Sequence, residues 1–327
     1  MWERFTYYGM RALLVLFLVA QVSAGGFGLD DKTATAIYGL YTAAAYLAAL
    51  PGGWIADRLI GAQRAVLAGG IAITAGNALL ALSSSPAGFY LGLVVIVAGV
   101  GLLKPNVSAI VAELYPQGGA RLDSAFTLFY VGINIGGFLG PLVAGEAQVL
   151  FGYRAGFAAA ALFMGVGVLQ FVVTRRHLGA AGSRPTRAAD EPVSPGGMLV
   201  APAADVASAG GTSRQWWSVA AAVAAAGALL AAVGAGLIHV DAVALAQSAT
   251  YIIVGMTVVY FIYYFFFAGL SIEERRRGVV LGVLVIGSAL FWSGYEQAGS
   301  SLNLLCAILI SSYCAQSLAD INVTESV

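Results

Sequence analysis

The stretch MWERFTYYGMRALLVLFL (1–18) opens the chain and combines the apolar length of a membrane helix with three charged side chains. These are Glu3, Arg4 and Arg11. A charge inside a bilayer is costly, so charged residues in a membrane helix usually face a polar interior and have a function. The sequence therefore predicts a membrane helix over 3–24 that lines such an interior.

The polar residues of this helix share one face. At about 100° per residue they fall within an arc of about 140°. The face consists of Glu3, Arg4, Tyr7, Tyr8 and Arg11. It would line a polar cavity or meet countercharges. The alternative is that residues 1–8 form an interfacial end in the headgroup region, with the tyrosines in an aromatic belt. Arg11 argues against that alternative because it lies a further turn along the helix.

The composition of the whole chain is that of a membrane protein. Of its 327 residues, 60% are hydrophobic and 10% are charged, whereas soluble domains carry about 25% charged residues. The apolar residues come in stretches of about twenty, which is the length of a membrane-crossing helix. The net charge is zero, so nothing indicates a nucleic-acid partner.

Cysteine and histidine usage predicts neither a disulfide framework nor a metal site. Cys306 and Cys314 lie together in one late segment, while His177 and His239 are far from them in sequence. The glycines near GVGLLK (99–104) lack the spacing and the ending of a phosphate-binding loop. We therefore expect no metal, no cofactor, no ATP-driven step and no enzymatic activity.

Apolar stretches and turn residues predict nine membrane helices, at 3–24, 33–55, 64–83, 87–111, 123–145, 153–174, 216–238, 248–270 and 278–299. With the N-terminus in the cytoplasm, the inner loops hold eleven basic residues and the outer loops hold two, Lys32 and Arg154. This positive-inside bias predicts a multi-pass protein of the inner membrane with a cytoplasmic N-terminus. The run EERRR (273–277) is interpreted as a topology anchor.

Residues 178–214 are rich in Pro, Gly, Ala and Ser and are typical of a flexible linker on the cytoplasmic side. They follow a block of six helices in residues 1–177. Six helices and then a long linker is the layout of a two-bundle transporter. The alternative, a six-helix membrane protein with a tail, is less consistent with the charge in the ninth helix.

Several motifs resemble those of one transporter family. ERFTYYGMR (3–11) resembles the ExxERFxYYG signature of the proton-dependent oligopeptide transporters, the POT or PTR family of the major facilitator superfamily. GGWIADRLIGAQR (52–64) resembles the superfamily's loop between helices two and three, and GLLKPNVS (101–108) a family pattern. FYVGINIGGFLGP (129–141) and FWSGYEQAGSSLNL (291–304) are similar to the family's helices five and seven.

The resemblance covers residue 1 to about 304 and implies an all-α membrane protein with the major facilitator fold. It assigns residues 1–177 to the N-terminal six-helix bundle, 215–271 to a two-helix insertion of bacterial members, and 272–304 to the first helix of the C-terminal bundle. Residues 305–327 form a divergent tail. The implied function is symport of di- and tripeptides with protons by alternating access.

The chain departs from the family at both ends. The family signature begins with a glutamate three residues before Glu3, at the position just before Met1, and we expect the upstream codon to encode it. After Leu304 the pattern is lost and five helices of the second bundle are missing, which indicates a truncation or an altered reading frame near residue 305. We expect the 327-residue chain alone to be inactive.

A site for many peptides must bind what all peptides share, which is an ammonium, a carboxylate and the backbone between them. The implied partners are Arg11 and Lys104 for the carboxylate and Glu296 for the ammonium. Further predicted substrate-binding residues are Tyr7, Tyr8, Tyr41, Asn134 and Trp292. The alternatives are that Lys104 snorkels to the cytoplasmic interface and that Glu296 lies in water at the outer end of its helix.

Proton coupling needs an acid whose protonation depends on its partners. The predicted proton-coupling residues are Glu3, Arg4, Lys104 and Glu296. The predicted gating-loop residues are Asp57, Arg58 and Arg64. Gly132, Gly136 and Gly140 recur every fourth residue and predict close helix packing.

Two other functions are compatible with parts of the sequence. A transporter of the same fold could carry nitrate or another small solute, although Glu296 would repel an anion. A non-transporting membrane protein, either a sensor or a degenerate gene product, would also explain the divergent end. The expected partners are a di- or tripeptide, protons and the lipid bilayer, and the oligomeric state is not predicted.

Overall fold

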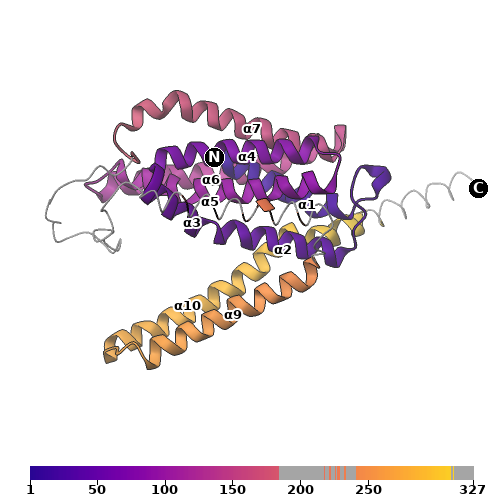
Figure 1. Cartoon of the computed structure of the whole chain (residues 1–327). Coiled ribbons are helices and arrows are strands. Elements are labelled where there is room, and N and C mark those ends of the chain that lie inside the picture. Colours follow the sequence, from indigo (N-terminus) through magenta and orange to yellow (C-terminus); the bar gives the residue numbers. More distant parts are fainter. Residues whose placement is uncertain are drawn as a thin grey trace, which may run out of the picture. The chain divides into compact units, whose positions relative to one another are not determined.

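The structure, a computed structural model, describes residues 1–183 and 241–310 together with positions 217, 221, 225, 227, 228, 232 and 312. Its main elements are helices (Figure 1): α1 (Trp2–Val19), α2 (Asp31–Leu47), α3 (Ala49–Ile55), α4 (Ala62–Leu82), α5 (Pro86–Glu113), α6 (Gly119–Phe151), α7 (Tyr153–Thr174), α9 (Ala242–Phe266) and α10 (Ile272–Glu296). Most of the predicted linker and of the predicted helix 216–238 lies outside the described residues.

The helices are those of a multi-pass membrane protein. Seven of the described helical segments are long and apolar enough to cross a bilayer: Asp31–Ile60, Ala62–Leu82, Pro86–Glu113, Gly119–Phe151, Tyr153–Leu178, Ala242–Phe266 and Ile272–Ile310. Helix α1 is also continuous, with Glu3 in its first turn and Arg11 near its middle. The predicted all-α membrane class is therefore confirmed.

The chain divides into two compact units, and the division falls inside α1 and α2. The first unit comprises Met1–Met10 and Tyr41–His239, and the second comprises Arg11–Leu40 and Val240–Val327. The predicted domain boundaries near residues 177, 214, 271 and 304 are not tested by this division and stay predictions.

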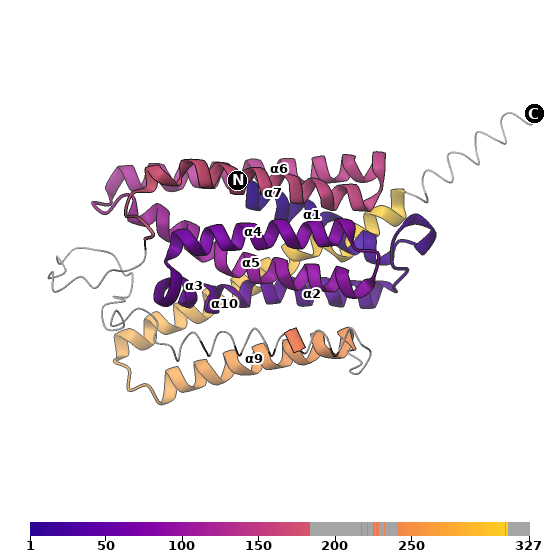
Figure 2. The ribbon, with the colours of Figure 1, turned by 45° about the horizontal axis from the view of Figure 1, so that its top comes forward.

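In the first unit, α4 packs against α5 and α7, and α7 packs against α6 (Figure 2). Small residues let the α4 and α5 backbones approach closely, because a Cβ on Gly69 would lie 2.6 Å from the carbonyl oxygen of Gly99. Phe89 of α5 and Phe157 of α7 meet edge to face and are fully buried. The first unit thus has the packing of a helical bundle with a closed core.

The predicted glycine packing on α6 is confirmed at two of three positions. A Cβ on Gly136 would lie 2.9 Å from the backbone nitrogen of Phe5, and one on Gly140 would lie 3.1 Å from that of Gly9. On Gly132, the nearest atom would be 3.8 Å away, which is ordinary contact. The absence of side chains at the first two positions allows α1 and α6 to touch through their backbones.

The expected loop over 52–64 is wrong in its local structure. The helical path continues beyond α3 through a π-helical turn at Ala56–Ile60, and the connection to α4 is Gly61 alone, with a φ of 82°. Asp57 and Arg58 therefore lie on a helical turn, because nothing before Gly61 breaks the helix. Arg64 is exposed in the first turn of α4.

In the second unit, Asp30 caps the start of α2 by accepting a hydrogen bond from the Thr33 backbone at 3.0 Å. Hydrogen bonds from Thr33 also lower the pKa of the Asp30 carboxyl. This is the usual way to satisfy free backbone donors at a helix start.

Helices α9 and α10 lie side by side as an antiparallel pair (Figure 1). A capping box between Ser271 and Glu274 starts α10 at Ile272, earlier than the predicted start at 278. The run 273–277 consequently lies inside the helix and not in a loop. Arg275 donates to the carbonyl of Phe265 at 3.1 Å and so joins the two helices.

Candidate functional site

The second unit contains an ion pair between residues at opposite ends of the sequence. Arg11 Nη1 lies 2.8 Å from Glu296 Oε2. Arg11 comes from the middle of α1, and Glu296 is the last residue of α10. The side chains are 6% and 22% exposed, so the pair is largely withdrawn from solvent. The structure thus brings together two of the predicted substrate-binding residues, one of each sign.

Aromatic rings surround this pair. The Arg11 guanidinium lies 5.6 Å from the ring centre of Tyr38 and 5.9 Å from that of Tyr295. The Tyr38 hydroxyl donates to Glu296 Oε2 at 3.5 Å. Rings on which a guanidinium stacks supply cation–π attraction and exclude water, and both effects strengthen the charges inside.

The backbone comes close to the pair at Gly299, just after α10. A Cβ at this position would lie 2.8 Å from Arg11 Nε and 3.0 Å from Tyr38 Cζ, so a larger residue would displace these side chains. Asn303 donates to the backbone carbonyl of Ala12 at 2.8 Å and ties the following helical segment to α1. The geometry around Arg11 is therefore held by backbone as well as by side chains.

One oxygen of the Glu296 carboxylate remains available. Oε2 binds Arg11 and Tyr38, whereas Oε1 is buried and accepts no hydrogen bond from the described residues. A buried acceptor without a donor is unfavourable. A cationic donor that enters this site would satisfy it.

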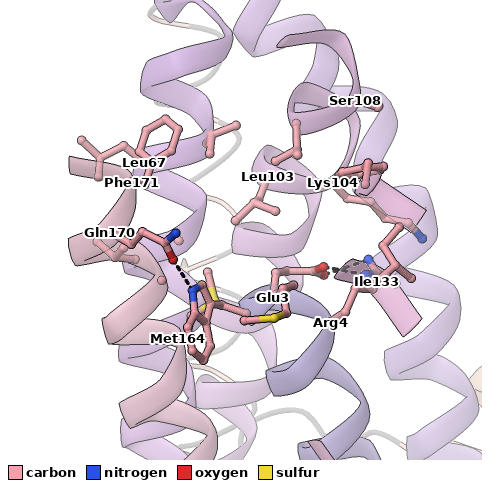
Figure 3. A pocket seen from close by; sticks show the side chains of 18 of the residues that line it. Glu3, Arg4, Leu67, Leu103, Lys104, Ser108, Ile133, Met164, Gln170 and Phe171 are labelled. Atoms are coloured by element: carbon pink, nitrogen blue, oxygen red, sulfur yellow. Dashed lines mark hydrogen bonds and ion pairs between the residues drawn. The ribbon is translucent and has the colours of Figure 1, made fainter. Parts of the chain in front are cut away.

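The first unit holds a second ion pair, between neighbours on α1. Arg4 Nε and Nη2 lie 2.6 Å and 2.8 Å from the two oxygens of Glu3. Figure 3 shows this forked contact at the edge of a cavity. Arg4 also lies over the ring of Tyr7, at 5.2 Å from its centre. Two of the three charges of the opening stretch, Glu3 and Arg4, are therefore paired with each other.

The cavity has a volume of about 710 Å³ and is lined by α1, α4, α5, α6 and α7. Glu3, Arg4 and Lys104 all line it, so three of the predicted proton-coupling residues share one space (Figure 3). Lys104 Nζ lies 3.7 Å from the ring centre of Tyr46. At another wall, Trp2 Nε1 donates to Gln170 at 2.5 Å.

The predicted tyrosines form a cluster in the first unit. Tyr7 meets Tyr8 edge to face at 5.3 Å and stacks with Tyr41 at 6.5 Å between ring centres. Tyr7 and Tyr41 are both buried. The rings thus form a continuous aromatic wall between α1 and α2.

Two predicted substrate-binding residues do not join these groups. Asn134 is exposed on α6 and donates to the carbonyl of Tyr130 in its own helix, at 2.9 Å. Trp292 is 44% exposed, and its ring meets those of Phe291 and Tyr295 on its own helix, α10. Their roles in binding stay predictions.

Sequence reasoning missed three polar residues of these sites. Tyr38 and Tyr295 are partners of Arg11, and Asn77 is a fully buried amide on α4. Tyr295 directly precedes Glu296, and Asn77 is a lone amide in the apolar stretch 64–83. A polar residue in a membrane helix is itself a functional signal, which could have identified Asn77.

Comparisons with known proteins agree with this architecture. The sequence profile described as "POT family" matches residues 63–312. Peptide transporter YePEPT of Yersinia enterocolitica is 38% identical over 316 residues, which is 93% of this chain and 57% of the relative. The di-/tripeptide transporter of Lactococcus lactis subsp. cremoris is 41% identical over 192 residues, which is 58% of this chain and 39% of that protein.

Solved structures give the same result. A mutant of peptide transporter POT in complex with alafosfalin matches with a TM-score of 0.72 and 37% identity, over 92% of this chain and 57% of that one. A POT family transporter in complex with 5-aminolevulinic acid matches with a TM-score of 0.75 and 30% identity, over 93% of this chain and 58% of that one. The chain spans little more than half the length of these relatives, and its helices have their major facilitator fold. It therefore belongs to the POT family.

Proposed function

We propose that this chain supplies both charged poles of the peptide site in a proton-coupled symporter of di- and tripeptides. The observation that carries the proposal is the buried pair of Arg11 and Glu296 between the rings of Tyr38 and Tyr295. Relatives named as peptide transporters support it. The proposal follows from what the two ends of the pair can bind.

A peptide is a zwitterion, and the pair has the matching signs. The planar guanidinium of Arg11 can bind a carboxylate through two parallel hydrogen bonds. Glu296 can receive the peptide ammonium at Oε1, which is the oxygen without a hydrogen bond. A bound peptide would therefore replace one ion pair by two, and the buried charges would stay neutralised.

Other residues have proposed roles that rest on the sequence. Lys104 is a proposed carboxylate contact, and the proposed contacts along the peptide backbone and side chains are Tyr7, Tyr8, Tyr41, Asn134 and Trp292. The tyrosine cluster and the cavity position of Lys104 support this assignment within the first unit.

For proton coupling we propose Glu3, with Arg4 and Lys104 as the cations that hold it ionised, and Glu296 as the second acid. An ionised carboxylate is favoured while Arg4 is bound to it, and it becomes more basic when the two separate in a dry site. In proteoliposomes that contain a full-length version of the transporter, Glu3→Gln is expected to abolish uptake driven by a pH gradient and to spare counterflow. Unchanged gradient-driven uptake would remove Glu3 from the mechanism.

We also propose the inner membrane as the location, with a cytoplasmic N-terminus, from the excess of basic residues in alternate loops. Asp57, Arg58 and Arg64 are then proposed gating residues on the cytoplasmic side. An impermeant thiol reagent added to whole cells should label Lys32→Cys and should not label Arg64→Cys.

Peptide binding is tested by thermal stabilisation of the chain in bilayer discs. A ligand at 100 times its Kd stabilises the folded protein by about 2.7 kcal/mol. We expect a free dipeptide to raise the melting temperature, and an N-acetylated dipeptide, a dipeptide amide and nitrate to do so far less, because each lacks one pole. Stabilisation by nitrate equal to that by the dipeptide would contradict the proposal and favour an anion transporter.

Matched carboxylates on α10 make this test specific. Glu296→Gln should remove the difference between the free and the N-acetylated dipeptide, because the ammonium loses its partner. Glu273→Gln changes an exposed carboxylate of the same helix, which is 79% exposed, and should leave the difference unchanged.

A further inference from the structure

Asn77 presents an acceptor that no described residue satisfies. Its side chain is fully buried on α4, and its Nδ2 donates to the Ile73 carbonyl in the same helix at 2.8 Å. Because a carbonyl can only accept, this bond fixes which end of the amide is the nitrogen. The remaining atom, Oδ1, is buried without a hydrogen bond.

Asn77 lines a narrow space in the first unit, and Glu3 lines the same space. The space is too narrow to hold a water molecule, so solvent cannot satisfy Oδ1. Apart from Asn77, the polar side chains of its walls are Glu3, Thr6 and Tyr7. A donor for Oδ1 must come from one of these three.

One of the three already donates elsewhere, because the Thr6 hydroxyl bonds the Ala160 carbonyl at 3.0 Å. The ring of Tyr7 contacts Arg4, Tyr8 and Tyr41. These ring contacts do not engage its hydroxyl, so Tyr7 is the donor that competes with Glu3. Ionised Glu3 is an acceptor only and binds Arg4 through both oxygens. When Glu3 takes up a proton, it gains an O–H group and no longer holds Arg4 as strongly.

We propose that Asn77 is a positioning residue for proton uptake, whose Oδ1 accepts a hydrogen bond from the carboxylic acid form of Glu3. The proposal rests on the proton-coupling role proposed above. The proton arrives from solution through the cavity of about 710 Å³, which Glu3 also lines. Protonation transfers the carboxyl from Arg4 to Asn77, so each charge state of Glu3 has a partner of its own.

The surroundings of Glu3 suit such a two-partner site. The charged side chains that line the cavity with it are Arg4 from its own helix and Lys104 from α5. The other helices contribute uncharged polar side chains. Asn77 of α4 lines the narrow space, and Tyr130 of α6 and Gln170 of α7 line the cavity. Asn77 is therefore a neutral acceptor in a space that Arg4 and Lys104 do not line, and as an acceptor it would stabilise the neutral acid selectively.

Infrared difference spectroscopy of the chain in bilayer discs tests this without a transport assay. Acidification should produce the C=O band of a protonated carboxyl that is absent in Glu3→Gln. In Asn77→Leu, this band should move to higher frequency and its titration midpoint should fall by about one pH unit, the effect of losing one neutral hydrogen bond. Asn77→Asp keeps the size of the side chain and should raise the midpoint, because a second carboxylate favours protonation.

Asn106 provides the matched control. It is buried on α5 and donates to the Leu102 carbonyl at 2.6 Å, as Asn77 does to Ile73, but it lines neither of the two spaces around Glu3. Asn106→Leu should leave band and midpoint unchanged. A band and midpoint unaltered in Asn77→Leu and Asn77→Asp would overturn the inference, as would a shift produced by Tyr7→Phe instead. Either result leaves the dipeptide stabilisation test untouched, and a failure of that test leaves the spectroscopic result standing.

Discussion

Helix α1 carries one ion pair in each of the two compact units, and the two pairs are built differently. Glu3 and Arg4 are adjacent in sequence, so their contact needs no second helix. Arg11 and Glu296 meet only when α1 and α10 are both in place. The local pair can therefore separate without changing the packing of the helices. The long-range pair forms only when α1 and α10 are packed together.

The two halves of α1 also differ in their contacts. Up to Met10 the helix touches α6 through backbone at Gly9 and Gly140. From Arg11 onward it has buried apolar side chains such as Leu14, and in addition an ion pair, a cation–π contact and the hydrogen bond from Asn303. Close backbone packing tolerates no added atom, while a polar site tolerates a ligand of matching charge.

The largest effect is expected from breaking the long-range pair. Glu296→Gln leaves Arg11 buried without its anion and should lower the free energy of unfolding in bicelles by about 3 kcal/mol, because a lone buried charge is strongly destabilising. The double variant Arg11→Leu, Glu296→Leu removes both charges and should recover most of the loss. Equal stability of Glu296→Gln and wild type would mean that water or lipid already solvates Arg11.

The second-largest effect on stability is expected at the backbone contact between the first half of α1 and α6. A methyl group at Gly140 meets the Phe5 carbonyl, and Gly140→Ala should lower the free energy of unfolding by about 2 kcal/mol through overpacking. Gly132→Ala is the control, because its Cβ would meet Met1 at 3.8 Å and should change little. Similar losses for both variants would show that helix propensity and not the α1–α6 contact decides the effect.

The same comparison shows what the sequence could predict. Membrane helices follow from apolar length, and the glycine contacts at Gly136 and Gly140 follow from their spacing. The contact between Glu3 and Arg4 joins neighbours in sequence, so it needs no pairing of distant helices. The partnership of Arg11 and Glu296 could be proposed from a family resemblance and from charge, but periodicity alone cannot pair two helices so far apart in sequence.

Other features depended on local chemistry that apolar patterns do not record. The capping box of Ser271 and Glu274 starts α10 at Ile272, so the charged run 273–277 lies inside the helix. Hydropathy alone placed these charges in the preceding loop. The helical turn at 56–60 was missed because Gly61 alone ends it. Asn77 was missed because its importance comes from an unsatisfied atom, which only three-dimensional packing reveals.

A smaller loss of stability is expected from breaking the pair of Glu3 and Arg4. Glu3→Gln keeps a side chain of the same shape that still accepts a hydrogen bond from Arg4, so the free energy of unfolding should fall by about 1 kcal/mol, the difference between a charge-assisted and a neutral bond. The matched comparison is Glu296→Gln, which makes the same substitution in the partner of Arg11. If Glu3→Gln destabilised the protein as much as Glu296→Gln, the first pair would also be a requirement of the fold.

The smallest effect is expected at a pair that is both local and exposed. Arg277 and Glu273 lie one turn apart on α10 at 3.6 Å, with side chains 78% and 79% exposed. Exposed pairs of this spacing contribute about 0.3 kcal/mol and are screened by salt. Glu273→Gln should therefore change the free energy of unfolding by no more than about 0.5 kcal/mol, and the change should vanish in concentrated salt, whereas the loss in Glu296→Gln should persist. If salt removed the effect of Glu296→Gln as well, Arg11 would be open to solvent, and burial would no longer distinguish the pair of the proposed peptide site from a surface pair.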